Sequence, residues 1–295
     1  MTAVAIPGEL GSFSHAAALA AHGPEIHLVP CVDFPELFRT VTEGKAEHGV
    51  VPIENSLAGS IHENYDLLRT HSLCVVGETE IRVRHCLIVR PGTTLEQVCR
   101  VASHPVALAQ CRRFFAAHPT MTAVPAYDTA GSVRDLMDDR VAADAAIASD
   151  LAARLYGGSV LREGLEDDPA NFTRFLLVSR HPAPVRAGAT SKTSLVVSLA
   201  NVPGSLHRAL GSFARRGLDL SKIESRPIPG RPWEYVFYLD VLGDPVEVET
   251  ALAELTADTG AADSVRLLGT YAATGTIRCA NHADSAFAGR PLGDP

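Results

Sequence analysis

The chain has 295 residues, of which 46% are hydrophobic and 20% are charged, and its formal net charge is −8 at pH 7. This length suffices for two domains or slightly more, and the apolar content is typical of a folded protein with large cores. The excess of acidic residues argues against nucleic acid or an anionic membrane surface as the main partner. An anionic substrate is not excluded, because a local cationic pocket is enough to bind one.

The residue types that hold metals, disulfides and nucleotides do not form the usual patterns. Six cysteines show no Cys-x-x-Cys pair and no disulfide framework, which favours a reduced, cytoplasmic chain. The N-terminus lacks the features of a signal peptide, and no apolar run approaches a membrane span. Twelve scattered histidines, no Walker lysine, no Rossmann glycine spacing and no Gly-x-Ser-x-Gly motif predict neither a metal site nor a nucleotide cofactor.

Short apolar strands alternate with helices in the first part of the chain, as in βαβ units with a largely parallel sheet. We expect strands at 4–6, 26–31, 48–53, 73–76, 85–89, 101–103, 121–127, 145–149 and 172–178. This pattern predicts two α/β lobes, the second inserted in the first, with a cleft between them. Lobe one is expected at 1–80 plus 160–180 and lobe two at 81–159, with crossovers at 77–84 and 158–163.

The remainder of the chain predicts a second, smaller domain. Residues 181–191 are rich in proline and glycine, as in a linker. Strand 192–199, helix 204–216, strands 218–227 and 233–242, helix 245–258 and strand 264–271 follow. This βαββαβ order is that of a ferredoxin-like domain at 192–273. The tail at 274–295 has little periodicity, and we expect it to be disordered.

Polar clusters follow four of the predicted strands of the first region. They are Gly11-Ser12-Phe13-Ser14, Glu54-Asn55-Ser56, Ser103-His104 and Asp128-Thr129. Ligands of open α/β sheets bind at the carboxyl ends of strands, and free N–H groups at helix starts favour an anion. Each cluster taken alone is equally what a helix N-cap requires, so both interpretations stay open here.

The strand 172–178 combines a hydroxyl with an aromatic ring. Side chains of a strand alternate between faces, so Thr173 and Phe175 share one face while Arg174 lies on the other. The first face suits a small, partly apolar, oxygen-rich ligand, although an ordinary half-buried strand has the same pattern. In the smaller domain, Glu224 with Ser225 is a candidate for an amino-acid ammonium. Leu206 and Ile223 are candidates for the wall of an apolar pocket.

Seven motifs occur in an order that resembles the monofunctional bacterial prephenate dehydratases. They are Gly11-Ser-Phe-Ser, Val51-Pro-Ile-Glu-Asn-Ser56, Ser103-His-Pro105, Thr129-Ala, Asn171-Phe-Thr-Arg-Phe175, Asn201-Val-Pro-Gly-Ser-Leu206 and Glu224-Ser-Arg-Pro227. The resemblance extends from about residue 4 to 272. It implies a catalytic region with a type II periplasmic-binding fold, followed by an ACT domain. Two departures stand out: Gly8-Glu-Leu-Gly11 replaces a Gly-Pro-x-Gly opening, and Ser205 replaces a common alanine.

The resemblance also implies an activity. It implies decarboxylating dehydration of prephenate to phenylpyruvate without a cofactor, feedback inhibition by phenylalanine, and homodimers or homotetramers. Thr173 matches the catalytic threonine and is expected to hydrogen-bond the leaving hydroxyl. For Arg174, a carboxylate contact and a structural ion pair stay open. The rest of the candidate active site is Ser12, Glu54, Asn55, Ser56, Ser103, His104, Thr129 and Phe175. The candidate effector site is Asn201, Pro203, Gly204, Ser205, Leu206, Ile223, Glu224, Ser225, Arg226 and Pro227.

Three other functions stay open at this stage. Arogenate dehydratase has the same chemistry on the aminated substrate. A non-catalytic cytoplasmic amino-acid sensor would combine a solute-binding fold with an ACT domain. A purely structural assembly module would leave the polar clusters without a purpose.

Overall fold

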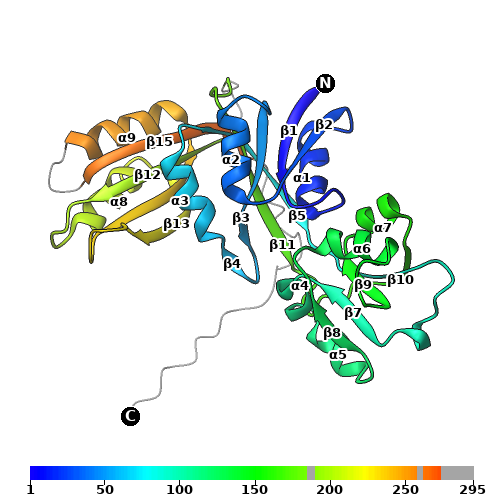
Figure 1. Cartoon of the computed structure of the whole chain (residues 1–295). Helices are drawn as coiled ribbons and strands as arrows, with labels where there is room; N and C mark the ends of the chain where they lie inside the picture. The colour runs from blue at the N-terminus through cyan, green and yellow to red at the C-terminus, as the bar shows by residue number, and fades with distance from the viewer. Residues whose placement is uncertain (185–189, 258–261, 274–295) are drawn as a thin grey trace, which may run out of the picture.

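The computed structural model describes residues 1–184, 190–257 and 262–273 (Figure 1). Part of the predicted linker and the whole predicted tail lie outside the described residues. Within them, three sheets form two α/β lobes and a smaller C-terminal domain. No helix of the described chain is both long and apolar enough to cross a membrane.

Lobe one is built on a mixed sheet. Its strand order is β2 (Ile26–Cys31), β1 (Thr2–Pro7), β3 (His48–Asn55), β11 (Phe172–Ser179) and β5 (Cys74–Arg82), with β4 (Gly59–Ser60) paired to β3. β1 runs parallel to β2 and β3, whereas β11 runs antiparallel to β3 and β5. The helices of this lobe are α1 (Phe13–His22), α2 (Phe34–Thr42) and α3 (His62–Thr70). β11 therefore returns from lobe two into the middle of the first sheet.

Lobe two has its own sheet of five strands. Their order is β10 (Ser159–Glu163), β6 (Cys86–Val89), β9 (Ala145–Ala148), β7 (Arg100–Ser103) and β8 (Thr122–Pro125). The 3₁₀ helix η1 (Leu95–Gln97) and the helices α4 (Pro105–Ala109), α5 (Arg112–Ala117), α6 (Thr129–Met137) and α7 (Asp150–Tyr156) complete the lobe. β6, β7 and β9 are almost entirely buried, as their apolar runs predict.

The predicted crossovers need correction. β10 pairs antiparallel with β6, so residues 159–163 belong to the sheet of lobe two and not to a connection. The other predicted crossover, at 77–84, is largely strand, because β5 continues to Arg82 beside β11. β10 is a largely exposed edge strand, so its sequence lacks the alternation of apolar and polar residues that indicates a half-buried strand. The chain returns to lobe one after β10, between residues 164 and 171.

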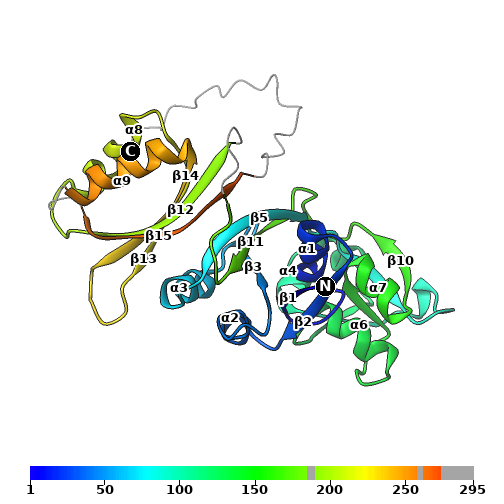
Figure 2. The same ribbon diagram turned by 90° about the horizontal axis from the view of Figure 1, so that it is seen from above.

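The C-terminal domain has the predicted βαββαβ order. Its elements are β12 (Ser191–Leu199), α8 (Ser205–Ala214), β13 (Asp219–Pro227), β14 (Tyr235–Gly243), α9 (Pro245–Ala257) and β15 (Ala262–Ala272). The antiparallel sheet has the order β13-β14-β12-β15. Both helices cover one face of this sheet, and the other face turns toward lobe one (Figure 2). The expected ferredoxin-like fold is confirmed.

The smaller domain packs on lobe one through a shared apolar core. Tyr238 and Tyr271 of its sheet belong to the same buried cluster as Tyr65 and Leu176 of lobe one. The hydroxyl of Tyr238 donates to the backbone oxygen of Tyr65 at 2.7 Å. The sheet of this domain therefore lies against the back of the strands whose ends form the candidate site.

Candidate active site

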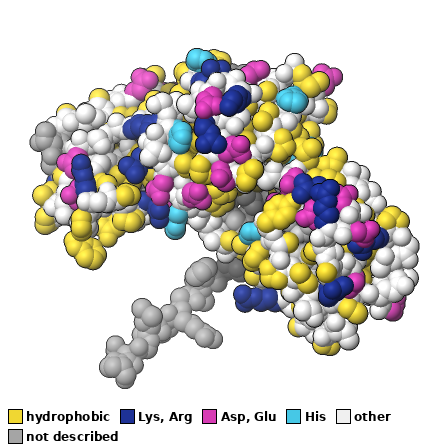
Figure 3. Space-filling model, viewed as in Figure 1, with side chains coloured by type: hydrophobic (Ala, Val, Ile, Leu, Met, Phe, Trp, Pro, Cys, Tyr) yellow, Lys and Arg dark blue, Asp and Glu magenta, His cyan; other side chains and the backbone are white. Residues whose placement is uncertain are grey.

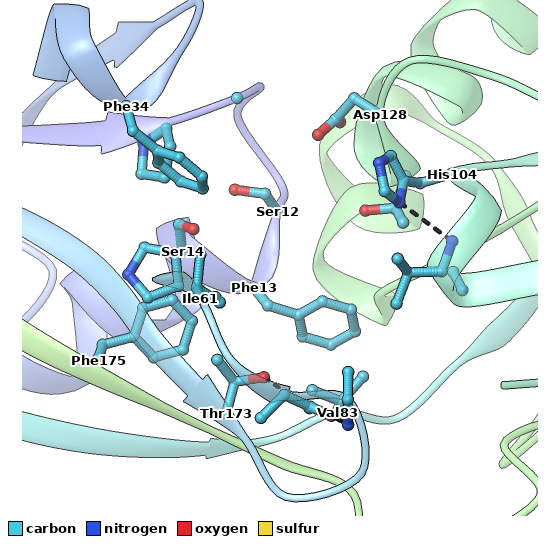
Figure 4. A pocket seen from close by; sticks show the side chains of 18 of the residues that line it. Ser12, Phe13, Ser14, Phe34, Ile61, Val83, His104, Asp128, Thr173 and Phe175 are labelled. Atoms are coloured by element: carbon cyan, nitrogen blue, oxygen red, sulfur yellow. Dashed lines mark hydrogen bonds between the residues drawn. The ribbon is translucent and has the colours of Figure 1, made fainter. Parts of the chain in front are cut away.

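A cleft of about 710 Å³ lies between the two lobes. In the space-filling view, the two lobes meet across a hollow whose rim carries hydrophobic as well as charged side chains (Figure 3). In the close-up, Ser12, Thr173 and Phe175 lie on one wall, and His104 and Asp128 lie on the opposite wall (Figure 4). The predicted site residues that line this cleft are Ser12, Asn55, His104, Thr129, Thr173 and Phe175.

The hydroxyl of Thr173 is held in place by Asn55. Asn55 Nδ2 donates to Thr173 Oγ1 at 3.1 Å, and it also lies within hydrogen-bond distance of the Phe172 backbone oxygen and of Asn171 Oδ1. Asn55 Oδ1 accepts from the backbone N–H groups of residues 57–58. Because Thr173 Oγ1 accepts from Asn55, its own hydrogen remains free to donate into the cleft. Asn55 thus orients the threonine.

A second chain of hydrogen bonds crosses between the lobes. Gln110 Oε1 accepts from Asn171 Nδ2 at 3.0 Å and faces His85 Nε2 at 2.9 Å. An amide oxygen carries no hydrogen, so the hydrogen in this bond is on His85 Nε2. Burial lowers the pKa of His85, which keeps the ring neutral. His85 and Gln110 line the cleft and were not predicted, because His85 begins an apolar strand and Gln110 ends a helix.

Besides Arg174, three predicted residues do not line the cleft. Ser103 is fully buried and donates to the backbone oxygen of Ile147 at 2.6 Å. Ser56 joins the loop after β3 to the start of β11, because its hydroxyl donates to the Ala170 oxygen and accepts from the Phe172 N–H. Glu54 points away from the cleft and pairs with Lys222 at 2.9 Å. In this structure backbone groups or a lysine already satisfy these side chains, so they are not placed to grip a substrate.

Arg174 lies on the opposite face of β11 from Thr173. Its guanidinium pairs with Glu78 at 2.8 Å and with Asp240 at 2.6 Å, and it donates to the hydroxyl of Tyr271. The Arg174 side chain is only 13% exposed. Asp240 and Tyr271 come from the C-terminal domain, so the geometry is that of a structural ion pair between domains.

The charged side chains that line the cleft are acidic, which is unusual for a site that binds an anionic substrate. Four carboxylates line it, from Glu9, Asp33, Glu63 and Asp128, and no lysine or arginine is among the lining residues of the described chain. Burial raises the pKa of Asp128. The N-terminus of α1 and that of α6 supply positive ends of helix dipoles at the cleft, beside Ser12 and Asp128.

The loop at the start of α1 also joins the lobes. Glu9, which replaces the proline of the related motif, pairs with Arg134 of lobe two at 2.8 Å. The hydroxyl of Tyr127 lies 3.2 Å from the carboxylate of Glu9 and accepts from Arg134. Ser149 donates to the backbone oxygen of Gly11 at 2.6 Å. The departure from the expected motif therefore contributes an ion pair between the lobes.

The candidate effector residues that belong to β13 lie on its two faces. Glu224 pairs in register with Tyr238, on the face toward lobe one, whereas Ser225 pairs with Phe237, on the face toward the helices. The two side chains therefore do not converge on one point, because neighbours on a strand point to opposite sides. α8 starts after Gly204, whose φ is +83°, and no side chain caps it.

Comparison with known proteins places this geometry in a family. The model of the prephenate dehydratase family matches residues 4–183, and that of the ACT domain matches residues 193–258. Arogenate dehydratase/prephenate dehydratase 2 of Arabidopsis thaliana is 39% identical over 285 residues, which cover 91% of this chain and 72% of the relative. The bifunctional chorismate mutase/prephenate dehydratase of Stutzerimonas stutzeri is 38% identical over 272 residues, with the same shares. The chain spans 66–72% of the length of the first curated relatives that it matches.

Solved structures agree with the sequence relatives. The prephenate dehydratase of Arthrobacter aurescens in complex with L-Phe has a TM-score of 0.84 and 35% identity, covering 92% of this chain and 90% of that one. A structure described as GqqA, a novel type of quorum quenching acylase, has a TM-score of 0.83 and 35% identity, covering 92% and 98%. Since the family model and these relatives span the catalytic lobes, the chain belongs to the prephenate dehydratase family and carries an ACT domain.

Proposed function

We propose that this chain converts prephenate to phenylpyruvate, CO2 and water, and that phenylalanine inhibits it through the ACT domain. The observation that carries the proposal is the Thr173 hydroxyl, which Asn55 fixes with its hydrogen free at the cleft. The relatives named prephenate dehydratase support the choice of substrate.

The reaction needs little chemistry from the protein. The bond from the ring to its carboxylate breaks, its electron pair enters the ring, and the bond from the ring to the hydroxyl oxygen breaks. One proton is consumed, since the prephenate dianion and a proton yield the phenylpyruvate anion, CO2 and water. Aromatisation supplies the driving force. The protein has to orient the substrate, desolvate the departing carboxylate and stabilise the leaving oxygen.

Each requirement has a candidate among the cleft residues. The hydrogen of Thr173 donates to the leaving hydroxyl, and the proton arrives through water, because a threonine hydroxyl is a weak acid by itself. The N-termini of α1 and α6, with Ser12 and Thr129, bind carboxylate oxygens. Phe13 and Phe175 form an apolar surface against the ring (Figure 4).

The decisive test is turnover by the purified chain. We expect phenylpyruvate to form from prephenate in the absence of added metal or nucleotide. Absence of turnover with prephenate and with arogenate would refute the enzyme and favour the amino-acid sensor.

Phenylalanine control is proposed from the ACT domain. The uncapped N-terminus of α8 offers N–H groups to the effector carboxylate, and Leu206 and Ile223 supply half-exposed apolar side chains. The Arthrobacter aurescens neighbour is a complex with L-Phe.

The heat of phenylalanine binding, measured by calorimetry, tests the effector site. Analytical sedimentation tests the proposed homodimer or homotetramer. The cytoplasmic location stays a prediction.

The carboxylates of the cleft favour arogenate as a second substrate. Arogenate carries an ammonium group where prephenate has a keto group, so its net charge suits an acidic wall better. Asp128→Asn is a suitable probe, because asparagine also caps helices well and would preserve the start of α6. We expect this change to lower kcat/KM for arogenate more than for prephenate. Equal losses for both substrates would refute the role of Asp128 in recognising the ammonium.

A further inference from the structure

Strand β13 links the candidate effector site to the catalytic lobe. Lys222 and Glu224 point toward lobe one, while Ile223 and Ser225 point toward the helices of the ACT domain. Lys222 is 10% and Glu224 20% exposed in their side chains. Both charged groups are therefore mostly withdrawn from solvent, and each finds its partners on the catalytic lobe.

These partners belong to the hairpin formed by β3 and β4. Lys222 Nζ lies 2.9 Å from Glu54 and donates to Ser60 Oγ at 3.1 Å. Ser60 Oγ donates to Glu224 Oε2 at 2.7 Å, and His62, just after the hairpin, lies 3.1 Å from Glu224 Oε1. Glu54 and Ser60 are cross-strand neighbours in the hairpin. We call the group of Lys222, Glu224, Glu54, Ser60 and His62 the hairpin clamp.

The same hairpin forms part of the cleft. Residues 58–61 line the cleft, and Asn55, which begins the turn, holds the hydroxyl of Thr173. Asn55 pairs across the hairpin with Gly59, one residue from Ser60. Ser60 therefore joins Lys222 and Glu224 of β13 to the hairpin that carries Asn55, the side chain that orients Thr173.

We propose that the hairpin clamp transmits effector binding in the ACT domain to the active site, with Glu224 as a transmitting residue and not an effector ligand. This inference rests on the proposed function. An amino acid bound beside Ile223, Ser225 and the start of α8 displaces β13, and the clamp shifts the hairpin between two positions. Coupling of this kind requires that the effector bind the protein more tightly when the hairpin is in one of its two positions than when it is in the other.

The test separates effector binding from effector action in the full chain. Glu224→Gln and Lys222→Met each remove one charge of the clamp and keep the side-chain length. We expect both variants to bind phenylalanine within about threefold of the wild-type Kd, because the effector face of β13 is intact. At saturating phenylalanine, we expect less than half of the wild-type inhibition of prephenate turnover. Ile223→Ala should show the opposite, with weaker binding and full inhibition at saturation.

Asp66→Asn provides the matched control. Asp66 pairs with Arg226 at 2.7 Å across the same domain interface, but on α3 and not on the hairpin. This variant should keep both affinity and inhibition. If Glu224→Gln loses both phenylalanine affinity and inhibition, Glu224 is an effector ligand. If Asp66→Asn binds phenylalanine but is no longer inhibited, any contact that holds the ACT domain on lobe one has the same effect, and the hairpin clamp has no special role. Either result, or full inhibition of Lys222→Met, overturns the inference. Wild-type protein that binds phenylalanine without prephenate turnover would refute the proposed function instead.

Discussion

Replacement of Thr173 by valine tests the centre of the proposed site. Valine keeps the branched shape of threonine and removes only the hydroxyl. Asn55 Nδ2 retains acceptors at 2.7 Å and 3.0 Å, on Asn171 and on the Phe172 backbone, so the change leaves no buried donor unsatisfied. The cost to folding should therefore stay below about 1 kcal/mol.

The cost to catalysis should be much larger. The hydroxyl of Thr173 donates to an oxygen that gains negative charge as its bond to the ring breaks. Loss of one such donor typically lowers kcat by about 10²–10³, or about 2.7–4 kcal/mol in the barrier. We expect Thr173→Val to fall in this range with little change in KM, because the charge develops in the transition state and not in the bound substrate.

The assay is phenylpyruvate formation under saturating prephenate, with urea denaturation as a measure of folding. Thr173→Ser is the matched control, since it keeps the hydroxyl and loses only a methyl group, and it should retain at least a tenth of the wild-type kcat. A Thr173→Val protein with kcat within threefold of wild type would place less than about 0.7 kcal/mol of the barrier on this hydroxyl. Thr173 would then not be catalytic.

Two further predictions concern stability. Arg174→Met removes the arginine from Asp240 and from Glu78, but Glu78 keeps Lys192 at 2.7 Å, so the loss falls mainly on Asp240. The change should cost about 3 kcal/mol in urea denaturation. By contrast, the exposed pair of Arg154 should contribute less than about 0.5 kcal/mol when tested by Arg154→Met. Burial lowers the pKa values of His22 and His48, whose ring centroids lie 4.8 Å apart, so the folded state binds fewer protons than the unfolded state below about pH 6.5. The contribution of these two histidines to the free energy of unfolding should therefore be fully present above this pH and decrease toward pH 5. Equal denaturation midpoints at pH 7.5 and pH 5.5 would contradict this expectation.

Strand periodicity predicted one wall of the site well. Thr173 and Phe175 share a face because side chains alternate on β11, and both line the cleft. On the opposite wall, His104 and Thr129 line the cleft as expected, but Gln110 was missed. Gln110 reaches Asn171 only because the lobes fold together, and no local pattern in the sequence encodes that approach.

Serine between a strand and the following helix gave an ambiguous signal. Ser12 lines the cleft and caps α1, whereas Ser103 is equally well placed in sequence but donates to a neighbouring strand. A hydroxyl that can satisfy a backbone oxygen is stabilised there whether or not a ligand is near. Which of the two occurs depends on the distance to the next strand, which composition does not reveal.

The two faces of a strand explain why Arg174 and Glu224 were difficult to assign. Alternation correctly placed Arg174 away from Thr173, but it did not say what covers that side. The covering surface is the ACT sheet, which supplies Asp240 to Arg174 and Glu224 to Ser60. β11 thus carries the candidate catalytic hydroxyl on one face and a contact with the regulatory domain on the other. In the proposed transmission, β13 and the hairpin of β3 and β4 connect the candidate effector site with the candidate active site.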